Sequence, residues 1–335
     1  MQKKAIFLAE QGNTMINRVF DGNVRDRLNQ QVELQPVWIH PGNAKLHMEE
    51  LAGVEIAFST WGLPLFTVDE LQVYLPNLKV LFYAAGSVQR FAREYMSRNC
   101  AVVSTWAANA VPVAEYTAAQ IVLANKGYFQ TALHCKRNHE EAKQVAQLYP
   151  GNYAARVGIL GAGMIGKKVI ELLRPYHIQI DVFDPYLSDT AAAELGVRKT
   201  DLLDIFTNCD VISNHLANLP ATVGILNKQH FDKMQPHATL INTGRGAQLI
   251  EEDLIQALRD EPTRTAVLDV THPEPVSRDS ALLTLDNVIL TPHIAGSMGN
   301  EVARMGHYAA GECERYLSGV PLQYQVTLSM LETMA

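Results

Sequence analysis

The sequence is short of cysteine, of charge of one sign and of long apolar runs. Its four cysteines, Cys100, Cys135, Cys209 and Cys313, are far apart and form no Cys-x-x-Cys pair. This spacing predicts no disulfide framework and no metal site, and it is typical of free thiols in a reducing cytosol. No stretch approaches the roughly 18 consecutive apolar residues of a membrane span. We therefore expect no membrane partner.

The beginning of the chain, MQKKAIFLAEQGN, lacks the features of a leader segment. Its apolar run ends before Glu10, and no small-residue cleavage site follows. These features predict a cytoplasmic protein. Charged residues make up 19% of the chain and the formal net charge is −7. A nucleic-acid partner requires a basic face, so we expect none, and a small molecule is the expected ligand.

What the sequence does contain is a regular alternation of short apolar runs with helical spacing. Its 335 residues suffice for two domains of ordinary size. This alternation predicts βαβ units and parallel sheets, hence an α/β fold. The expected strands are Ala5–Leu8, Val54–Phe58, Val80–Tyr83, Val102–Val103, Val157–Leu160, Ile178–Phe183, Val211–Ser213, Thr239–Asn242, Thr265–Leu268 and Val288–Leu290.

The spacing of these strands divides the chain. A helical stretch from about Pro112 to about Asn138 separates the first strands from the later ones, with a break near residue 105. The last expected strand ends at Leu290, and a further helix is expected over Glu301–Leu317. Periodicity alone does not show which half that helix packs against.

The run VGILGAGMIG, residues 157–166, is a phosphate-binding motif candidate. Gly161, Gly163 and Gly166 fit G-x-G-x-x-G between an expected strand and the helix 167–173, whose free N-terminal N–H groups suit a pyrophosphate. Asp184 ends the next strand, where a carboxylate binds ribose hydroxyls and repels a 2′-phosphate, so NAD is favoured over NADP. The alternative is a glycine-rich turn without a ligand, beside a surface aspartate.

Three charged or titratable residues follow three later strands. Arg245 lies between Gly244 and Gly246, and Glu274 and His293 follow the next two strands. Ligands of open α/β sheets bind at the carboxyl ends of strands, so these side chains are expected in one cleft. Arginine holds a carboxylate by two hydrogen bonds, histidine transfers a proton, and a glutamate orients the histidine. Together with a hydride carrier they predict interconversion of a 2-hydroxy acid and a 2-oxo acid.

Each of these residues also has a plainer interpretation. Arg245 fits a solvated turn, although its two glycine neighbours indicate a close backbone approach. Glu274, between two prolines, fits an exposed loop, and His293 fits a hydrogen-bonded structural histidine. The combination favours the catalytic interpretation.

At this point the sequence resembles the D-isomer-specific 2-hydroxyacid dehydrogenase family. The matching motifs occur in the family's order and cover the chain from about residue 50 to about residue 320. They are NAVPVAEYT (109–117), VGILGAGMIG (157–166), LINTGRG (240–246), AVLDVTHPEP (266–275) and LTPHIAG (290–296).

The resemblance implies a role for each matching residue. Arg245 would bind the substrate carboxylate and carbonyl, His293 would be the general acid and base, and Glu274 would be its carboxylate partner. On the substrate side the resemblance adds the backbone of Ala85 and Gly86 and the side chain of Asn109. On the cofactor side it adds Met164, Ile165, His215, Thr243 and Gly296, with Asp269 holding the nicotinamide carboxamide.

The resemblance also implies the domain arrangement. A flavodoxin-like substrate-binding domain would comprise residues 1–106 and 302–335, and a Rossmann NAD-binding domain, 107–301, would be inserted between them. The helical stretch near 112–138 would pack in a homodimer. Because the chain stops soon after the returning helix, no appended regulatory domain is expected.

Several positions depart from the family pattern. The substrate loop reads AAGSVQRF, with Ala84 for a usual glycine and Val88 near a usual aspartate. Trp106 and Ala107 replace a usual Pro-Gly pair, and Ala217 replaces a usual proline. These changes leave the reaction type intact and the substrate open. Trp61 either closes over an apolar substrate tail or packs as a core tryptophan. Arg90, a second anion site in one interpretation, is a surface arginine in the other.

Three other functions remain at this stage. The first is another enzyme of this superfamily, such as a formate or a phosphite dehydrogenase. Formate dehydrogenases that resemble this family carry glutamine where this chain has Glu274, so Glu274 argues against a formate dehydrogenase. The second is an NAD-sensing binding protein, like the corepressors that share the fold and the catalytic residues. The third is a structural dimer with a vestigial site.

Overall fold

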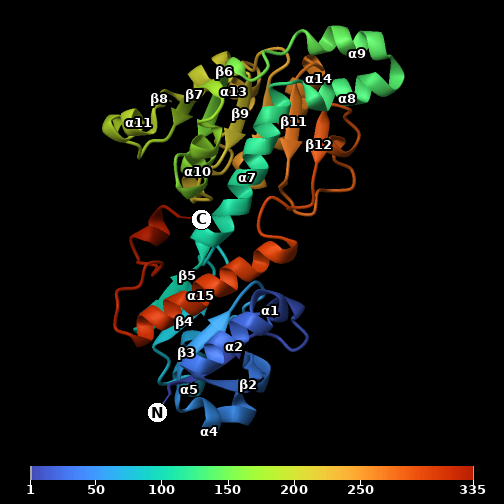
Figure 1. The fold of residues 1–335 in the computed structure, drawn as a ribbon. Helices are drawn as coiled ribbons and strands as arrows, with labels where there is room; N and C mark the ends of the chain where they lie inside the picture. Colours follow the sequence, from blue (N-terminus) through green and yellow to red (C-terminus); the bar gives the residue numbers. More distant parts are fainter. Residues whose placement is uncertain (1, 335) are drawn as a thin grey trace. The chain divides into compact units, whose positions relative to one another are not determined.

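The computed structural model describes residues 2–334 and divides into two compact units. The first comprises the residues up to Ala110 together with those from Ser297 onward, and the second is Val111–Gly296. Each unit is built on its own parallel sheet (Figure 1). Within the described residues, no helix combines the length and the apolar character needed to cross a bilayer.

The sheet of the first unit has five parallel strands in the order β2-β1-β3-β4-β5. This is the flavodoxin-like order, as expected. The strands are β1 (Lys4–Leu8), β2 (Glu33–Ile39), β3 (Val54–Ser59), β4 (Val80–Tyr83) and β5 (Ala101–Ser104). The helices of this unit are α1 (Thr14–Val19), α2 (Gly22–Gln31), α3 (Pro41–Ala44), α4 (Met48–Leu51), α5 (Val68–Tyr74), α6 (Ala92–Ser97) and α15 (Val302–Leu317).

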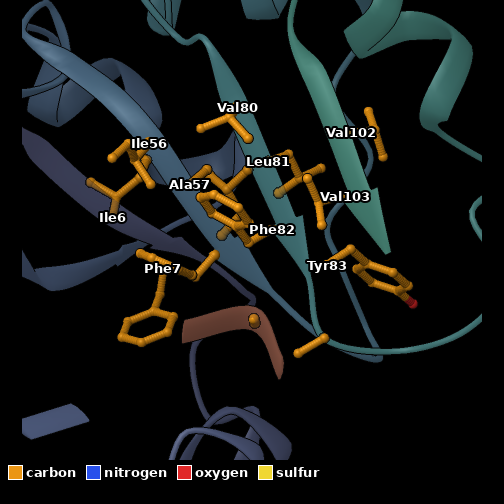
Figure 2. Packing of buried hydrophobic residues seen from close by; sticks show 14 of the residues in the cluster. Ile6, Phe7, Ile56, Ala57, Val80, Leu81, Phe82, Tyr83, Val102 and Val103 are labelled. Carbon is orange, nitrogen blue, oxygen red and sulfur yellow. The ribbon is translucent and has the colours of Figure 1, made fainter. Parts of the chain in front are cut away.

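The strands β1, β3 and β4 carry nearly continuous apolar runs because helices cover both faces of the sheet. Figure 2 shows side chains of β1, β3, β4 and β5 in one cluster. Phe58 stacks on Phe82 with ring centroids 5.4 Å apart, and Phe7 meets Phe20 edge-on at 5.0 Å. This packed core fixes the positions of the loops that follow β3 and β4.

The C-terminal helix α15 belongs to the first unit. Its apolar face, with Met305, Ala309 and Cys313 fully buried, joins the same hydrophobic cluster as β1 and β3. It contacts α1 and α2. The two ends of the chain therefore build one unit, as the family resemblance implied.

The sheet of the second unit has seven parallel strands in the order β12-β11-β10-β9-β6-β7-β8. They are β6 (Tyr153–Leu160), β7 (His177–Phe183), β8 (Arg198–Lys199), β9 (Val211–Asn214), β10 (Thr239–Asn242), β11 (Thr265–Leu268) and β12 (Val288–Leu290). The helices are α7 (Trp106–Ala124, which begins in the first unit), α8 (Tyr128–Arg137), α9 (His139–Ala146), α10 (Met164–Leu173), α11 (Asp189–Leu195), α12 (Leu202–Asn208), α13 (Lys228–Phe231) and α14 (Glu251–Asp260). This is a doubly wound Rossmann order, with the chain reversing direction across the sheet between β6 and β9.

Every strand expected from the sequence lies within an observed strand, but two strands were missed. Pro36 interrupts the apolar run of β2, and proline is tolerated there because β2 is an edge strand. The other missed strand, β8, has only two residues. The expectation of a continuous helical stretch over 112–138 was wrong. Gly127, with φ at +66°, separates α7 from α8, and α7 continues through Pro112.

Candidate active site

The turn that carries Arg245 follows β10 and leads into a short 3-10 helix, Gly246–Gln248. A Cβ at Gly246 would overlap the backbone of Thr271, and a Cβ at Gly244 would lie 2.8 Å from Gln248 Oε1. The two glycines therefore permit the close backbone approach that their positions suggested. The Arg245 Nη1 donates to the Gly244 carbonyl at 2.7 Å. Burial lowers the pKa of Arg245, while the nearby Glu274 raises it, and arginine stays protonated across the physiological range.

His293 and Glu274 form a pair on neighbouring loops. His293 Nδ1 and Glu274 Oε1 lie 2.7 Å apart, and both side chains are close to half exposed. Because a carboxylate only accepts, Nδ1 is the donor, which leaves Nε2 for proton exchange with a substrate. His293 has a left-handed φ of +55°, uncommon for a residue with a side chain. The structure therefore brings Glu274, His293 and Arg245 to one edge of the second sheet.

Asp269 organises the loop that carries His293. Its carboxylate is buried and accepts from the Thr291 hydroxyl at 2.6 Å, from the Ile294 N–H at 2.8 Å and from the Ala295 N–H at 2.9 Å. The His293 N–H donates to the Asp269 carbonyl at 3.0 Å. These bonds hold the backbone on both sides of His293. The contacts with Asp269 therefore stabilise the left-handed conformation of His293.

The glycine-rich turn lies between β6 and α10. Gly161 has φ at +93°, and a Cβ there would lie 2.8 Å from the His215 carbonyl oxygen. A Cβ at Gly166 would overlap the Gly161 carbonyl, so α10 packs tightly against the turn. A Cβ at Gly163, by contrast, meets no atom within 4 Å. Gly163 is the N-cap of α10 and no side chain caps this end. The open surface at Gly163 and the uncapped N-terminus, where Met164 and Ile165 begin the helix, fit a pyrophosphate.

Asp184 directly follows β7 and closes onto the same turn. Its Oδ2 accepts from the Ala162 N–H at 2.7 Å and its Oδ1 accepts from the Tyr186 N–H at 2.7 Å. Each carboxylate oxygen keeps lone-pair capacity for a further donor. The carboxylate is therefore held beside the glycine turn in a position that suits a pair of ribose hydroxyls.

The remaining residues expected near a cofactor lie on loops of the same sheet edge. His215 follows β9, its Nε2 lies 2.9 Å from Ser213 Oγ, and burial lowers its pKa to about 3. The Thr243 hydroxyl lies 3.2 Å from that of Thr117 on α7. Gly296 ends the second unit, directly after the Ala295 that Asp269 holds. His215 is thus neutral near pH 7.

Three buried amides at this edge escaped the sequence analysis. Asn214 ends β9, Asn242 ends β10 and Gln248 ends the 3-10 helix, and all are fully buried. Asn214 Nδ2 donates to Asn242 Oδ1 at 3.0 Å and to Gln248 Oε1 at 2.7 Å. The sequence signal that could have indicated Asn214 and Asn242 is the asparagine that ends each of the apolar runs VISN and TLIN. We refer to Asn214, Asn242 and Gln248 as the amide network.

Two residues expected to bind substrate in the first unit, Ala85 and Gly86, lie on the loop after β4, and a third, Asn109, lies in the first turns of α7. The Ser104 hydroxyl donates to the carbonyls of Ala85 and Gly86 at 2.9 and 2.6 Å. The Asn109 side chain lies beside Gly86, 3.6 Å from where a Cβ would be, and its Oδ1 accepts from the Ser297 N–H at 3.1 Å. These contacts fix the loop, and the structure brings Ala85, Gly86 and Asn109 together.

Trp61 follows β3 in the same unit. It is partly buried against the hydrophobic cluster, and its carbonyl accepts from Asn13 Nδ2 at 3.0 Å. Part of the side chain thus packs against the core and part is accessible. Val88, at a usual aspartate position, is fully buried, and Arg90 is exposed.

Residues 120–295 match the model of the D-isomer-specific 2-hydroxyacid dehydrogenase NAD-binding domain. This match covers more than half of the chain. The chain belongs to the D-isomer-specific 2-hydroxyacid dehydrogenase family. The second unit is accordingly an NAD-binding unit, and the glycine turn, the uncapped α10 and Asp184 fit that cofactor.

Several relatives in this family resemble the chain at modest identity. A D-3-phosphoglycerate dehydrogenase of Archaeoglobus fulgidus is 28% identical over 257 residues, 76% of this chain and 48% of that protein. One of Methanocaldococcus jannaschii is 30% identical over 72% of this chain and 46% of that protein. A hydroxypyruvate reductase of Blautia hydrogenotrophica is 31% identical over 50% of this chain and 51% of that protein. The chain thus spans about half the length of these relatives.

Solved structures share the fold over nearly the whole chain. The apo form of a D-mandelate dehydrogenase from Rhodotorula graminis aligns with a TM-score of 0.80 at 18% identity, covering 98% of both chains. A 2-hydroxyacid dehydrogenase from Ketogulonicigenium vulgare aligns with a TM-score of 0.74 at 21% identity, covering 98% of this chain and 99% of that one. These likenesses confirm the expected two-domain α/β architecture.

Proposed function

We propose that this family member is an NAD(H)-dependent oxidoreductase that interconverts a 2-oxo acid and the corresponding D-2-hydroxy acid. The observation that carries the proposal is the His293–Glu274 pair, 2.7 Å between Nδ1 and Oε1, beside the guanidinium of Arg245. All three residues follow carboxyl ends of strands in the unit that binds NAD. A proton donor and a carboxylate anchor are the groups that reduction of a 2-oxo acid requires.

Arg245 is proposed as the substrate anchor. Its planar guanidinium matches a carboxylate and can also donate to a neighbouring carbonyl oxygen. The glycine-flanked turn restricts the backbone from which the side chain extends. Partial burial strengthens its electrostatic attraction to a bound carboxylate, because less water screens it.

His293 is proposed as the acid in reduction and the base in oxidation. With Nδ1 bonded to Glu274, Nε2 is the atom that gives a proton to the carbonyl oxygen or removes one from the hydroxyl. Glu274 fixes the ring orientation and stabilises the protonated imidazole. Asp269 is proposed to position the loop through Ile294 and Ala295, in addition to the contact with the nicotinamide carboxamide that the resemblance implies.

When bound, NADH would supply the hydride for the carbonyl carbon. The protein's part is to hold the cofactor at the uncapped N-terminus of α10, beside Gly161 and Gly163, with Asp184 accepting from ribose hydroxyls. Met164, Ile165, His215, Thr243 and Gly296 are proposed as further contacts.

The first unit is proposed to contribute to substrate binding. The Gly86 N–H would donate to the substrate carboxylate, with Ala85 and Asn109 beside it. Trp61 is proposed to cover an apolar substrate tail. If Trp61→Ala leaves the order of preferred 2-oxo acids unchanged, that part of the proposal is wrong.

A cytoplasmic homodimer completes the proposal. Three exposed apolar side chains, Leu123, Tyr128 and Leu148, lie in α7, in α8 and just after α9, and exposed apolar surface favours self-association. The four cysteines are free thiols, which suits a reducing compartment. Sedimentation analysis tests the dimer and cell fractionation tests the location.

The test of the function is NADH oxidation by the purified protein across a panel of 2-oxo acids. The panel includes glyoxylate, pyruvate, hydroxypyruvate, and branched and aromatic acids. We expect turnover with a clear preference among them. NADH binding without turnover of any acid would favour an NAD-sensing binding protein instead.

A further inference from the structure

The carboxylate anchor and the proposed cofactor loop share one buried hydrogen-bond network, through Gln248. This side chain is fully buried, and its amide oxygen and its amide nitrogen each make two hydrogen bonds. Gln248 Oε1 accepts from the Arg245 N–H at 3.1 Å and from Asn214 Nδ2 at 2.7 Å. Gln248 Nε2 donates to the carbonyls of Leu216 and Ala217, at 2.8 and 3.0 Å. A primary amide has two N–H donors and an oxygen that accepts two hydrogen bonds, so every hydrogen-bonding group of the Gln248 side chain has a partner.

The other two amides hold the remaining backbone of the Arg245 turn. Asn242 Oδ1 accepts from the Gly244 N–H at 3.1 Å, and Asn242 Nδ2 donates to the Arg245 carbonyl at 3.2 Å. Both backbone polar groups of Arg245 are therefore bonded to side chains of the amide network. The Arg245 side chain extends from a backbone that these amides hold in place.

On the other side, the network holds the loop that follows β9. Asn214 Oδ1 accepts from the Leu216 N–H at 3.2 Å, while Gln248 holds the carbonyls of Leu216 and Ala217. This loop approaches the glycine-rich turn closely, because a Cβ at Gly161 would lie within 3.1 Å of His215 and Leu216 backbone atoms. A cofactor phosphate bound at the glycine-rich turn would therefore lie beside the loop after β9, to which Gln248 donates two hydrogen bonds.

We propose that Gln248, supported by Asn214, is a positioning residue that couples cofactor binding at the loop after β9 to the placement of Arg245. This rests on the proposed function, in which Arg245 holds the substrate carboxylate. When the bound cofactor restricts the motion of residues 215–217, the hydrogen bonds of Gln248 also restrict the backbone at the Arg245 N–H. Arg245 is then held more firmly for the substrate carboxylate when the cofactor is bound.

The matched substitutions separate this coupling from ordinary structural damage. Gln248→Met removes every bond of the side chain at similar volume. Gln248→Glu keeps an acceptor for the Arg245 N–H and loses at least one of the two bonds donated to the loop. The control is Gln130→Met, because Gln130 is also buried and its Nε2 donates to the carbonyls of Pro262, Thr263 and Arg264, at the opposite, amino-terminal end of β11.

The first measurement needs no substrate. Hydrogen exchange of the backbone is followed with and without NADH, in wild type and in the three variants. We expect NADH to slow exchange at residues 215–217 and also at Gly244 and Arg245 in wild type and in Gln130→Met. In Gln248→Met and Gln248→Glu the protection at Gly244 and Arg245 should be lost, while protection of the glycine turn persists. Protection of 215–217 without protection of 244–245 in wild type would overturn the coupling.

The second measurement uses oxamate, a small analogue of a 2-oxo acid, titrated onto each protein saturated with NADH. We expect the oxamate Kd to rise about tenfold in both Gln248 variants and to stay unchanged in Gln130→Met, since a displaced charged donor loses roughly one hydrogen bond's worth of binding. Unchanged oxamate binding in the Gln248 variants would overturn the coupling and leave the proposed function standing. Absence of oxamate binding in wild type, with NADH-dependent exchange as predicted, would overturn the proposed function alone.

Discussion

His293 Nδ1 lies 2.7 Å from Glu274 Oε1, and this is the pair to which we assign proton transfer in the proposed function. The two residues come from loops after different strands, β11 and β12, and neither is buried. The pair therefore owes its geometry to the backbone around it, chiefly the bonds to Asp269, and not to packing of the side chains themselves.

Removal of the proton donor should abolish most turnover. We expect His293→Ala to lower kcat by roughly 10²–10⁴-fold, the usual contribution of a positioned acid or base. The NADH Kd should stay nearly the same, because the imidazole pairs with Glu274 on the loops after β11 and β12, whereas the glycine turn follows β6. Glu274→Gln should give a smaller loss, since an amide still bonds to the ring without its charge. Steady-state kinetics and NADH titration measure kcat and the NADH Kd of both variants. A fully active His293→Ala protein would contradict the assignment of His293 as the proton donor.

Substitution of the arginine should act mainly on substrate binding. Arg245→Ala should raise KM for the 2-oxo acid by about 100-fold and also lower kcat, because a bidentate charged contact is lost. Arg245→Lys should recover only part of this, since lysine is a single point of charge. Arg259→Ala, an exposed arginine of α14, is the control and should change neither constant. Equal KM values in Arg245→Ala and wild type would rule out the anchor.

Two glycines should respond to alanine in opposite ways. Gly246→Ala should destabilise the protein strongly, because the new methyl group would overlap the Thr271 backbone. Gly163→Ala should fold with an unchanged Tm, since its methyl group meets no atom within 4 Å. The same methyl group should weaken NADH binding, because it occupies the surface proposed for the pyrophosphate. Thermal unfolding and NADH titration separate the two effects, and full NADH affinity in Gly163→Ala would contradict the proposed cofactor position.

Asp184 should set the choice between the two nicotinamide cofactors. Asp184→Ala removes a carboxylate that would repel a 2′-phosphate, so the preference for NADH over NADPH should fall by about tenfold. NADH affinity should fall as well, because the Ala162 N–H loses its acceptor. Asp189→Ala, which removes an exposed acid of α11, is the control for net charge. An unchanged ratio of the two affinities in Asp184→Ala would show that another residue discriminates.

His215 should make the protein less stable in acid. Burial lowers its pKa in the folded state to about 3, whereas an unfolded histidine titrates near 6.5. Between those values the unfolded state binds more protons, so the free energy of unfolding falls as the pH drops below about 6.5. Between pH 7 and pH 5 this amounts to about 2 kcal/mol, from roughly 1.4 kcal/mol per pH unit below the unfolded pKa. Urea unfolding of His215→Gln at pH 7 and pH 5 should show a smaller difference than wild type. The same difference in both proteins would contradict the burial effect.

The sequence predicted the elements of this fold well because hydrophobic period and glycine position are local properties. The expected strands were found, and Gly161 and Gly166 have the steric reasons that the motif implies. The glycines beside Arg245 also predicted a close approach, which the structure assigns to Thr271 and Gln248. Errors arose where a local signal misled: Pro36 hid β2, and Pro112 seemed to begin a helix that starts at Trp106.

The amide network could not be predicted from the same signals. Asn214 is 28 residues from Asn242 and 34 residues from Gln248, so its partners depend on the order of strands in the sheet. Asp269 is similar, because its carboxylate bonds to backbone groups about 25 residues away. Residue type at a strand end indicates a polar role there, but only the packed sheet shows what each polar group contacts.

The most direct test of the account is the fate of the hydride. The purified protein is incubated with NADH that carries deuterium at both C4 positions of the nicotinamide and with its preferred 2-oxo acid, and the product is analysed by mass spectrometry and NMR. We predict a 2-hydroxy acid with deuterium at C2, formed in one-to-one ratio with oxidised cofactor. Oxidised cofactor without deuterium at C2 of a hydroxy acid would contradict the proposed reaction.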